Sequence, residues 1–168
     1  MTTPLNGSIT LGQAPGTVDE IVRIADGAPI ALEKAALDNM ARVSSRIQRA
    51  IDQGQVIYGL TTGVGDLVTT RLSPDRMTDT QLNMLRSHAC GVGPDLTVRE
   101  VRAMMAVTLK SLLQGYSGVT PALAQRIADM LNRQVTPWSP AGGSVGYLIA
   151  TAHIGLAVFG EGKCWYQG

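Results

Sequence analysis

Residues 97–115 read TVREVRAMMAVTLKSLLQG, and this stretch decides the fold class. Thr97 and Glu100 have the spacing of a capping box, in which a hydroxyl and a carboxylate satisfy amide groups of the first helical turn. Apolar side chains then recur at three- or four-residue steps as far as Leu112, which is the period of a helix with one buried face. Gly115 is a typical residue to follow a helix. The stretch therefore predicts a strong amphipathic helix that ends before Gly115.

Four more segments carry apolar side chains at helical spacing. The predicted helices are a short one that Thr17-Val18-Asp19-Glu20 opens and Gly27 stops, a long one from about Ala31 to Gln53, one that Thr78-Asp79-Thr80-Gln81 opens and that closes near Gly91, and one from Thr120-Pro121 to about Asn132. Polar N-caps, and a proline at the first helical position, favour these starts.

Extended segments are few and short. Gln55-Val56-Ile57-Tyr58 is a β-like run that leads into a glycine-rich loop at residues 59–65. The apolar segment from Val145 to Phe159 is shorter than the ~20 residues of a membrane span, so it predicts a buried helix. We therefore expect a mainly α fold with short strands and glycine-rich loops, one domain over residues 1–168, and an extended or mobile stretch at residues 1–16.

Composition limits the possible partners. A net charge of +1 without a block of Lys or Arg argues against nucleic acid and against an anionic membrane surface. Hydrophobic residues make up 45% and charged residues 16%, which is apolar for a free-standing domain and predicts association or truncation. Cys90 and Cys164 fit neither a disulfide framework nor a zinc site. No signal peptide precedes the first helix, so we expect a cytoplasmic protein.

A glycine-rich turn at residues 142–146 runs directly into the apolar segment Tyr147-Leu148-Ile149-Ala150-Thr151-Ala152-His153. Such a turn before a helix brings backbone close to a ligand and presents amide N–H groups. Taken alone, this signal is weak.

Four segments in order resemble the N-terminal part of the aromatic amino acid ammonia-lyases, the family of histidine, phenylalanine and tyrosine ammonia-lyases and related aminomutases. The resemblance runs from about Thr17 to Gly168. It rests on Tyr58-Gly59-Leu60-Thr61-Thr62-Gly63-Val64-Gly65, Leu85-Arg86-Ser87-His88-Ala89-Cys90-Gly91-Val92-Gly93, Gly115-Tyr116-Ser117-Gly118-Val119, and Gly143-Ser144-Val145-Gly146 followed by His153 and Gly160-Glu161-Gly162-Lys163. It implies the fumarase/aspartase-like helical fold, a homotetramer, and a long helical bundle that this chain lacks.

In that family, Ala-Ser-Gly follows the Gly-Ser-Val-Gly segment and cyclises into a methylidene-imidazolone electrophile. Here Gly146 is followed directly by Tyr147, which stands where the family has Asp. Gly143, Ser144, Val145, Gly146 and Tyr147 would thus flank the electrophile. Two interpretations stay open: the cyclised group is a single non-standard residue that the one-letter string does not represent, or the tripeptide is deleted and the chain is an inactive remnant or pseudo-enzyme that only associates with other subunits.

The resemblance implies removal of ammonia from an aromatic amino acid to give the trans-arylacrylate, or transfer of the amine to the β-carbon in an aminomutase. Tyr58 matches the family's essential tyrosine, interpreted as the base that removes the β-proton. A phenol is a weak acid, so phenolate requires nearby helix N-termini or glycine amides. The alternative is a buried tyrosine at a strand end whose hydroxyl bonds to backbone.

The resemblance places Gly65, Leu85 and His88 at the substrate. His at the position of His88 accompanies imidazole or phenol rings, whereas the Thr61-Thr62-Gly63 segment looks more like the phenylalanine and tyrosine enzymes. Tyrosine satisfies both indications and histidine stays close behind, so the expected order is tyrosine, histidine, phenylalanine. The alternative for His88 is a helix C-terminal histidine that the macrodipole stabilises.

The remaining candidates have structural explanations. His153 lies within an apolar helix and is predicted to be a core histidine, and two histidines support no metal site. Ser117 and Ser144 lack a His or acid at nucleophile spacing, which argues against a serine hydrolase. We therefore expect no metal and no nucleotide, and an aromatic amino acid as the small-molecule partner.

Overall fold

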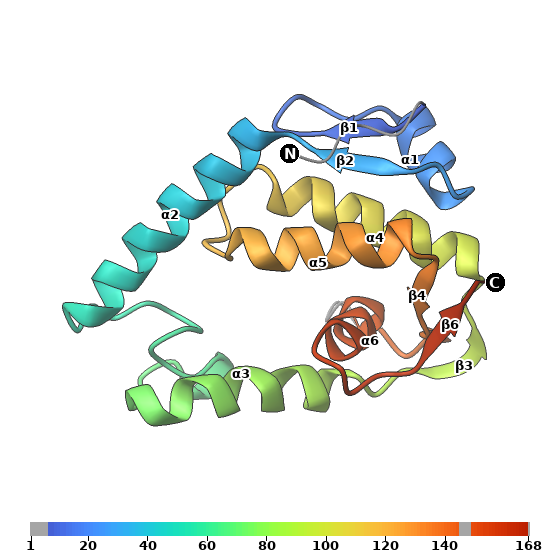
Figure 1. Ribbon diagram of the computed structural model, residues 1–168. Coiled ribbons are helices and arrows are strands. Elements are labelled where there is room, and N and C mark those ends of the chain that lie inside the picture. The colour runs from blue at the N-terminus through green and yellow to red at the C-terminus, as the bar shows by residue number, and fades with distance from the viewer. Residues whose placement is uncertain (1–6, 145–148, 168) are drawn as a thin grey trace.

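Helices α4 (Val98–Leu112) and α5 (Pro121–Asn132) lie side by side at the centre of the computed structural model (Figure 1), which describes residues 7–144 and 149–167. Val101, Met105 and Leu109 of α4 are fully buried, as the helical spacing predicts. They join a core that also includes Ile127 and Leu131 of α5. The mainly α fold class is confirmed.

Two capping boxes begin helices where the sequence predicts them. The Thr17 hydroxyl accepts the Glu20 N–H at the start of α1 (Val18–Ala25), and Glu20 accepts the Thr17 N–H in return. Thr97 and Glu100 make the same pair of bonds at the start of α4. Helix α5 begins with Pro121 at its first position, as expected. These three starts follow from local chemistry alone.

A short parallel strand pair covers one side of the central helices. Strand β1 (Ile9–Leu11) pairs with β2 (Ile30–Leu32), and α1 connects them. The predicted helix start at Ala31 is wrong, because α2 (Lys34–Asp52) begins only after β2. The Asn132 side chain holds the strand from across the core: its amide accepts the Ile30 N–H at 2.8 Å and donates to the Ile30 carbonyl at 3.0 Å.

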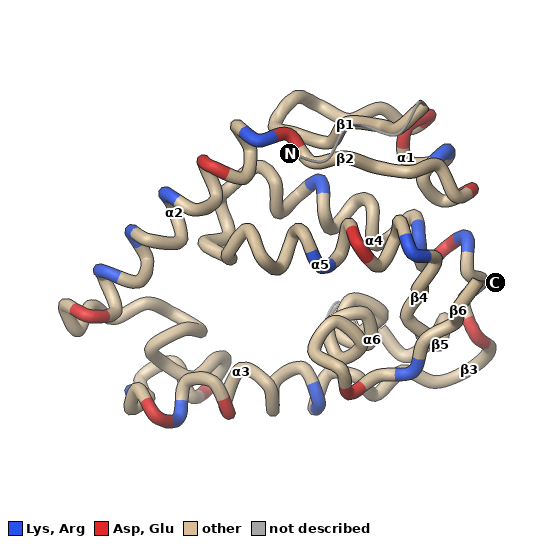
Figure 2. The backbone as a smooth tube through the Cα atoms, viewed as in Figure 1, with Lys and Arg blue, Asp and Glu red and all other residues tan. Residues whose placement is uncertain are grey.

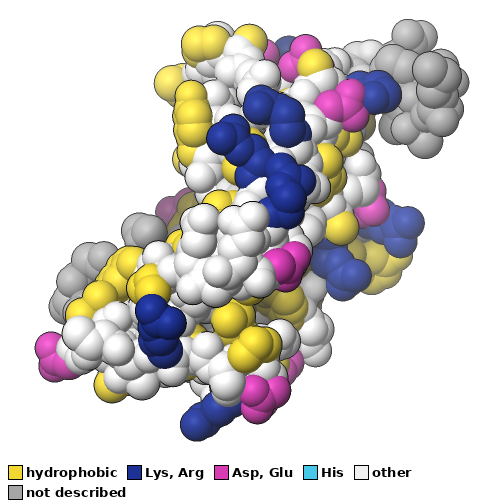
Figure 3. Space-filling view, turned by 90° about the vertical axis from the view of Figure 1, so that its left-hand side faces the viewer, with side chains coloured by type: hydrophobic (Ala, Val, Ile, Leu, Met, Phe, Trp, Pro, Cys, Tyr) yellow, Lys and Arg dark blue, Asp and Glu magenta, His cyan; other side chains and the backbone are white. Residues whose placement is uncertain are grey.

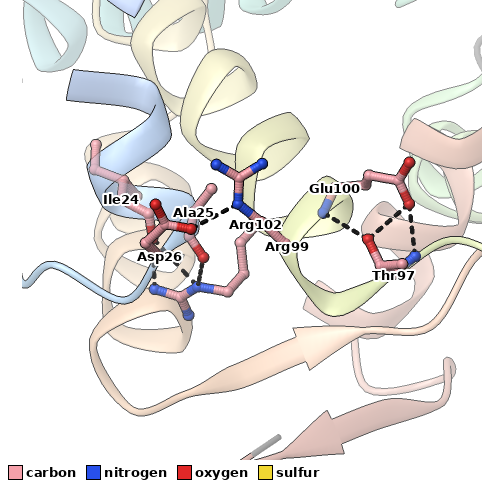
Figure 4. Close-up of polar contacts among 7 residues, drawn as sticks. All are labelled: Ile24, Ala25, Asp26, Thr97, Arg99, Glu100 and Arg102. Atoms are coloured by element: carbon pink, nitrogen blue, oxygen red, sulfur yellow. Dashed lines mark hydrogen bonds and ion pairs between the residues drawn. The ribbon is translucent and has the colours of Figure 1, made fainter. Parts of the chain in front are cut away.

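One arginine is buried in this core. Arg102 of α4 is 1% exposed, and its guanidinium donates to the carbonyls of Ile24 and Ala25 at the end of α1 (Figure 4). It also donates to the carbonyl of Leu131 at the end of α5. Desolvation lowers the pKa of the guanidinium. A cation at two helix C-terminal ends is favourable because the last carbonyls carry partial negative charge.

Helix α2 runs from the strand pair to the opposite end of the molecule (Figure 1). Only Ala36 and Met40 of this helix are buried. Arg42, Arg46 and Arg49 are exposed and lie at helical spacing on one face. Lys and Arg positions recur along α2 in Figure 2, and Figure 3 shows Lys and Arg side chains gathered on the face of the molecule that α2 occupies.

Helix α3 (Pro74–His88) follows a 3-10 turn, η1 (Gly65–Leu67). The predicted start at Thr78 is wrong, because Ser73 is the N-cap and Pro74 occupies the first position, one turn earlier. The β-like run at residues 55–58 forms no strand, since no other segment pairs with it. The helix ends at His88, close to the predicted end near Gly91.

Two antiparallel strand pairs lie next to α6 (Ile149–Val158). Strand β3 (Val92–Asp95) pairs with β5 (Pro140–Gly142), and β4 (Val135–Pro137) pairs with β6 (Cys164–Tyr166). Ile149, Ala152, Ile154 and Val158 of α6 are buried, so the predicted apolar helix is confirmed over its described residues. No described helix has the length and apolarity that a membrane crossing requires.

Candidate functional site

Two buried threonines organise the loop that carries Tyr58. The Thr61 hydroxyl accepts the Ile57 N–H at 2.7 Å and donates to the Gln55 carbonyl at 3.1 Å. The Thr62 hydroxyl accepts the Gly59 N–H at 3.2 Å and donates to the Gly63 carbonyl. Thr61 and Thr62 are 8% and 2% exposed, so the loop is built around them. Their contacts therefore hold the backbone on both sides of Tyr58.

Tyr58 projects outward from this loop with 63% of its side chain exposed. Its hydroxyl oxygen accepts the N–H of Gly65 at 3.2 Å. Gly65 has a φ of +58°, a left-handed conformation that glycine adopts without strain. The structure thus brings two predicted site residues together, and the buried strand-end position considered for Tyr58 is wrong. An N–H donor at the phenol oxygen stabilises negative charge there.

Gln81 attaches the Tyr58 loop to α3. Its side-chain amide donates to the Gly59 carbonyl at 2.6 Å, across 22 residues of sequence. His88 lies seven residues farther along the same helix, which corresponds to about 10 Å of helical rise. The loop and His88 are therefore held by one rigid element.

His88 is the last residue of α3 and is half-buried. Its Nδ1 lies 2.7 Å from the Met84 carbonyl oxygen and 3.1 Å from the Ser87 hydroxyl. Because a carbonyl oxygen only accepts, Nδ1 carries the hydrogen in this arrangement. The ring orientation is thus fixed from within α3. Leu85, one turn earlier, packs against α6, where a Cβ added at Gly155 would lie 2.9 Å from a Leu85 methyl carbon.

The glycine-rich segment that precedes α6 lies against the chain that follows α3. Val92 of β3 pairs with Gly142 of β5, and the backbone of Gly143 approaches Gly91 and Val92 within ordinary contact distance. Ser144 is exposed. Val145, Gly146 and Tyr147 lie outside the described residues. The structure therefore places residues 142–144 beside the end of the helix that carries His88.

Three contacts join α3 and the residues just after it to α6 and the turn that follows α6. Arg86 forms a bidentate ion pair with Glu161 at 2.5 and 2.7 Å, which lowers the pKa of the Glu161 carboxyl. Leu85 packs against Gly155, and the Gly91 N–H donates to Nε2 of His153 at 3.3 Å. His153 is thus hydrogen-bonded, as predicted from the sequence, but half-buried rather than in the core.

Several residues of this arrangement were not predicted from sequence. Gln81, Thr61 and Thr62 support the Tyr58 loop. The two threonines lie inside the glycine-rich motif at residues 58–65, but the motif did not indicate this role. A surface cleft of about 150 Å³ lies behind that loop, between the end of α2 and the start of α3, with Arg71 at its edge. No three His, Cys, Asp or Glu side chains come together as a metal site within residues 7–144 and 149–167.

Relatives of this chain by sequence include histidine ammonia-lyases. The enzyme of Geobacillus thermodenitrificans is 36% identical over 156 residues, which are 90% of this chain and 31% of the relative. A probable histidine ammonia-lyase of Thermoplasma acidophilum is 46% identical over 123 residues, which are 71% of this chain and 25% of the relative. The chain therefore spans between a quarter and a third of the length of these relatives.

Solved structures agree with the sequence relatives on the family. The tyrosine aminomutase of Streptomyces globisporus superposes with a TM-score of 0.91 at 30% identity, and the match covers 96% of this chain and 31% of that one. The family model described as aromatic amino acid lyase matches residues 17–168. The chain belongs to the aromatic amino acid lyase family.

Proposed function

We propose that this chain is the site-bearing part of an ammonia-lyase that converts an aromatic amino acid, with histidine first and tyrosine second, into the trans-arylacrylate and ammonia. The hydrogen bond from the Gly65 N–H to the Tyr58 hydroxyl carries the proposal, because it pairs a candidate base with the donor that such a base requires. In the reaction a proton leaves the β-carbon, the carbon–nitrogen bond breaks, and a double bond forms between the α- and β-carbons.

Tyr58 is assigned the removal of the β-proton. Its side chain is exposed and held from a loop whose backbone is fixed by Thr61 and Thr62. The Gly65 N–H supports negative charge on the phenol oxygen, and no side chain of Gly65 obstructs the approach of a substrate. Geometry and access therefore both suit a base that acts on a bound amino acid.

His88 is assigned to the substrate ring. The Nδ1 contact with Met84 fixes the orientation of the imidazole, which is a requirement for a polar group that discriminates between rings. A site that hydrogen-bonds an imidazole or a phenol disfavours a plain phenyl ring, because its polar group then stays unpaired. Leu85 lies one turn earlier on α3 and adds apolar surface beside it.

The flanks of the electrophile segment suit a group that is built from backbone. A Cβ added at Gly142 would lie 2.8 Å from the Val92 carbonyl oxygen, and one at Gly91 would lie 2.4 Å from a ring carbon of Pro140. Only bare backbone fits there, as a compact cyclised segment requires. When present, a methylidene-imidazolone supplies an electrophile that takes up the substrate amine; Gly143 and Ser144 would hold its near side.

The ring preference rests on two lines of support. The sequence relatives reported above carry the name histidine ammonia-lyase, which favours histidine. The similar fold of the tyrosine aminomutase and the Thr61-Thr62-Gly63 segment keep tyrosine as the second substrate. His88 fits either ring. We therefore place histidine ahead of tyrosine, in contrast to the order expected from the sequence alone, with phenylalanine last.

Intact mass spectrometry of the purified chain tests the electrophile. A mass above that of the sequence by a dehydrated Ala-Ser-Gly supports the lyase. A mass equal to that of the sequence refutes the electrophile and supports the second candidate, an inactive remnant that associates with other subunits. The direct junction of Gly146 and Tyr147 is the observation that favours this second candidate.

Ultraviolet detection of the arylacrylate tests the reaction and the base. The chain is incubated with histidine, tyrosine and phenylalanine, and turnover of phenylalanine alone would contradict the role of His88. Tyr58→Phe is expected to abolish turnover while circular dichroism stays unchanged. Tyr116→Phe is the matched control, because Tyr116 is 92% exposed on the loop between α4 and α5 and should keep full turnover. Turnover by the Tyr58 variant would remove it as the base.

A further inference from the structure

One residue touches both sides of the segment 145–148. On the near side, a Cβ added at Gly91 would lie 2.4 Å from Pro140 and 3.3 Å from the Gly142 carbonyl oxygen, both in β5. On the far side it would lie 3.1 Å from a methyl carbon of Ile149, the first residue of α6. Gly91 thus lies between the chain that enters the segment and the helix that leaves it, with no space for a side chain.

His153 fixes this contact from α6. Its Nε2 accepts the Gly91 N–H at 3.3 Å across 62 residues of sequence, so Nε2 has no hydrogen and Nδ1 carries the one of the neutral ring. Trp138 meets the imidazole edge-on, with ring centroids 5.5 Å apart and planes at 87°. Burial lowers the pKa of His153, which favours the neutral ring that the contact requires.

We infer that His153 is a positioning residue whose neutral imidazole, through the Gly91 N–H, holds β5 and α6 at a fixed distance from each other. The inference rests on the proposed function, since β5 and α6 lie on either side of the segment that is proposed to carry the electrophile. It assigns His153 no contact with substrate. Its action passes through Gly91 and the β3–β5 pairing.

Protonation releases this contact. An imidazolium has hydrogens on both nitrogens, so Nε2 stops accepting the Gly91 N–H. The pKa in the fold lies below the ordinary 6.5, so the contact is fully present above that pH and is lost as pH falls through the lowered pKa. The spacing of β5 and α6 is therefore sensitive to acid.

Other charged groups packed around α6 have partners of their own. Arg86 of α3 pairs with Glu161, and Arg126 of α5 donates to the Val158 carbonyl at the far end of α6. The Lys163 ammonium lies 5.2 Å from the centre of the Trp138 ring. His88 is the other histidine of the chain. A test must therefore separate the two histidines.

Two variants and a nuclear magnetic resonance measurement make that separation. In His153→Gln the side-chain oxygen keeps an acceptor that does not titrate, and in His153→Leu the acceptor is gone. The readouts are the ¹⁵N shifts of the two histidine rings and the hydrogen-exchange protection factor of the Gly91 amide between about pH 8 and pH 5. His88 is unchanged in both variants, so its ring signals are the same reference in all three proteins.

The neutral Nδ1–H form of His153 is expected at pH 7.5, with protection of Gly91 that falls on acidification. His153→Gln should keep the protection without the fall, and His153→Leu should lower it about fivefold, the loss of one ordinary hydrogen bond. Equal protection in all three proteins, or a hydrogen on Nε2 at neutral pH, overturns the inference. If His153→Leu does not fold, the contrast between wild type and His153→Gln decides. No substrate enters this test, so its result is independent of turnover.

Discussion

Replacement of Arg102 by methionine tests the energetics of the buried core. Methionine keeps most of the apolar stem of the arginine and removes the guanidinium. That group is the donor to two carbonyls at the end of α1 (Figure 4) and to one at the end of α5, and the side chain of Arg102 is 1% exposed. Water therefore cannot replace the lost donors without local opening of the helix ends.

Removal of the guanidinium leaves the three carbonyls with different numbers of hydrogen-bond donors. Ile24 and Leu131 keep backbone donors, from Gly27 at 3.1 Å and Gln134 at 3.3 Å. Ala25 loses its donor, because the residue four positions later, Pro29, has no N–H. One orphaned carbonyl costs about 1–3 kcal/mol. Two helix ends also lose an adjacent cation, at up to ~2 kcal/mol each, and relief of the buried charge offsets part of this.

The expected net loss in the free energy of unfolding is about 2–4 kcal/mol, or roughly 5–15 °C in Tm for a chain of this size. Urea unfolding followed by circular dichroism measures it. Arg99→Met is the matched control: Arg99 lies one turn earlier, and its ion pair with Asp26 at 2.6 Å is exposed, so its loss should change little. Equal destabilisation by the two variants, or a more stable Arg102→Met, would refute the reasoning.

Three further predictions concern other contacts. Gly91→Ala should lower the free energy of unfolding in urea by about 1–3 kcal/mol, because the new methyl lies 2.4 Å from a proline ring carbon. Gly16→Ala is the control and should be near neutral, because the atom nearest to its methyl, at 3.1 Å, belongs to a flexible lysine side chain. Equal losses in the two variants would contradict the close contact at Gly91. Thr97→Ala should cost about 1 kcal/mol by thermal unfolding through loss of the N-cap of α4, and an unchanged Tm would speak against the cap. Arg86 lowers the pKa of Glu161, so this carboxylate stabilises the fold above pH 4.5, and the stabilisation is lost as pH falls through the lowered pKa. Glu161→Gln should therefore make the urea midpoint depend less on acid pH. An unaltered pH dependence would exclude the Arg86–Glu161 pair as its source.

Helix starts were predictable wherever a few neighbouring residues decide them. Thr17 and Thr97 carry complete capping boxes, and both helices begin there. Thr78 carries the same signature and lies inside α3, because a proline four residues earlier had already begun the helix. Strand β2 was assigned to a helix, since its partners are β1 and the distant Asn132. Contacts between neighbouring residues could be predicted from the sequence, whereas pairing across the core could not.

The candidate site shows the same difference between contacts within one motif and contacts between distant segments. Tyr58 and Gly65 are seven residues apart in one glycine-rich motif, and their contact lies within it. The approach of Gly91 to His153 joins residues 62 positions apart, and no local pattern indicates it. His153 was predicted as a core histidine with a hydrogen-bond partner; the partner is confirmed, whereas the side chain is only half-buried. The identity of that partner required the fold. Motif order thus indicated the family, and the geometry between motifs came only from the structure.

Helix α3 also constrains how the length of this chain can change in evolution. It is attached to the Tyr58 loop at Gln81 and carries His88 seven residues later. One inserted or deleted residue between them would rotate everything beyond it by about 100° and shift it by about 1.5 Å. His88 would then turn to another face while the Tyr58 loop stayed in place. Length variation among functional relatives should therefore spare residues 81–88 and fall in the connections on either side of the helix.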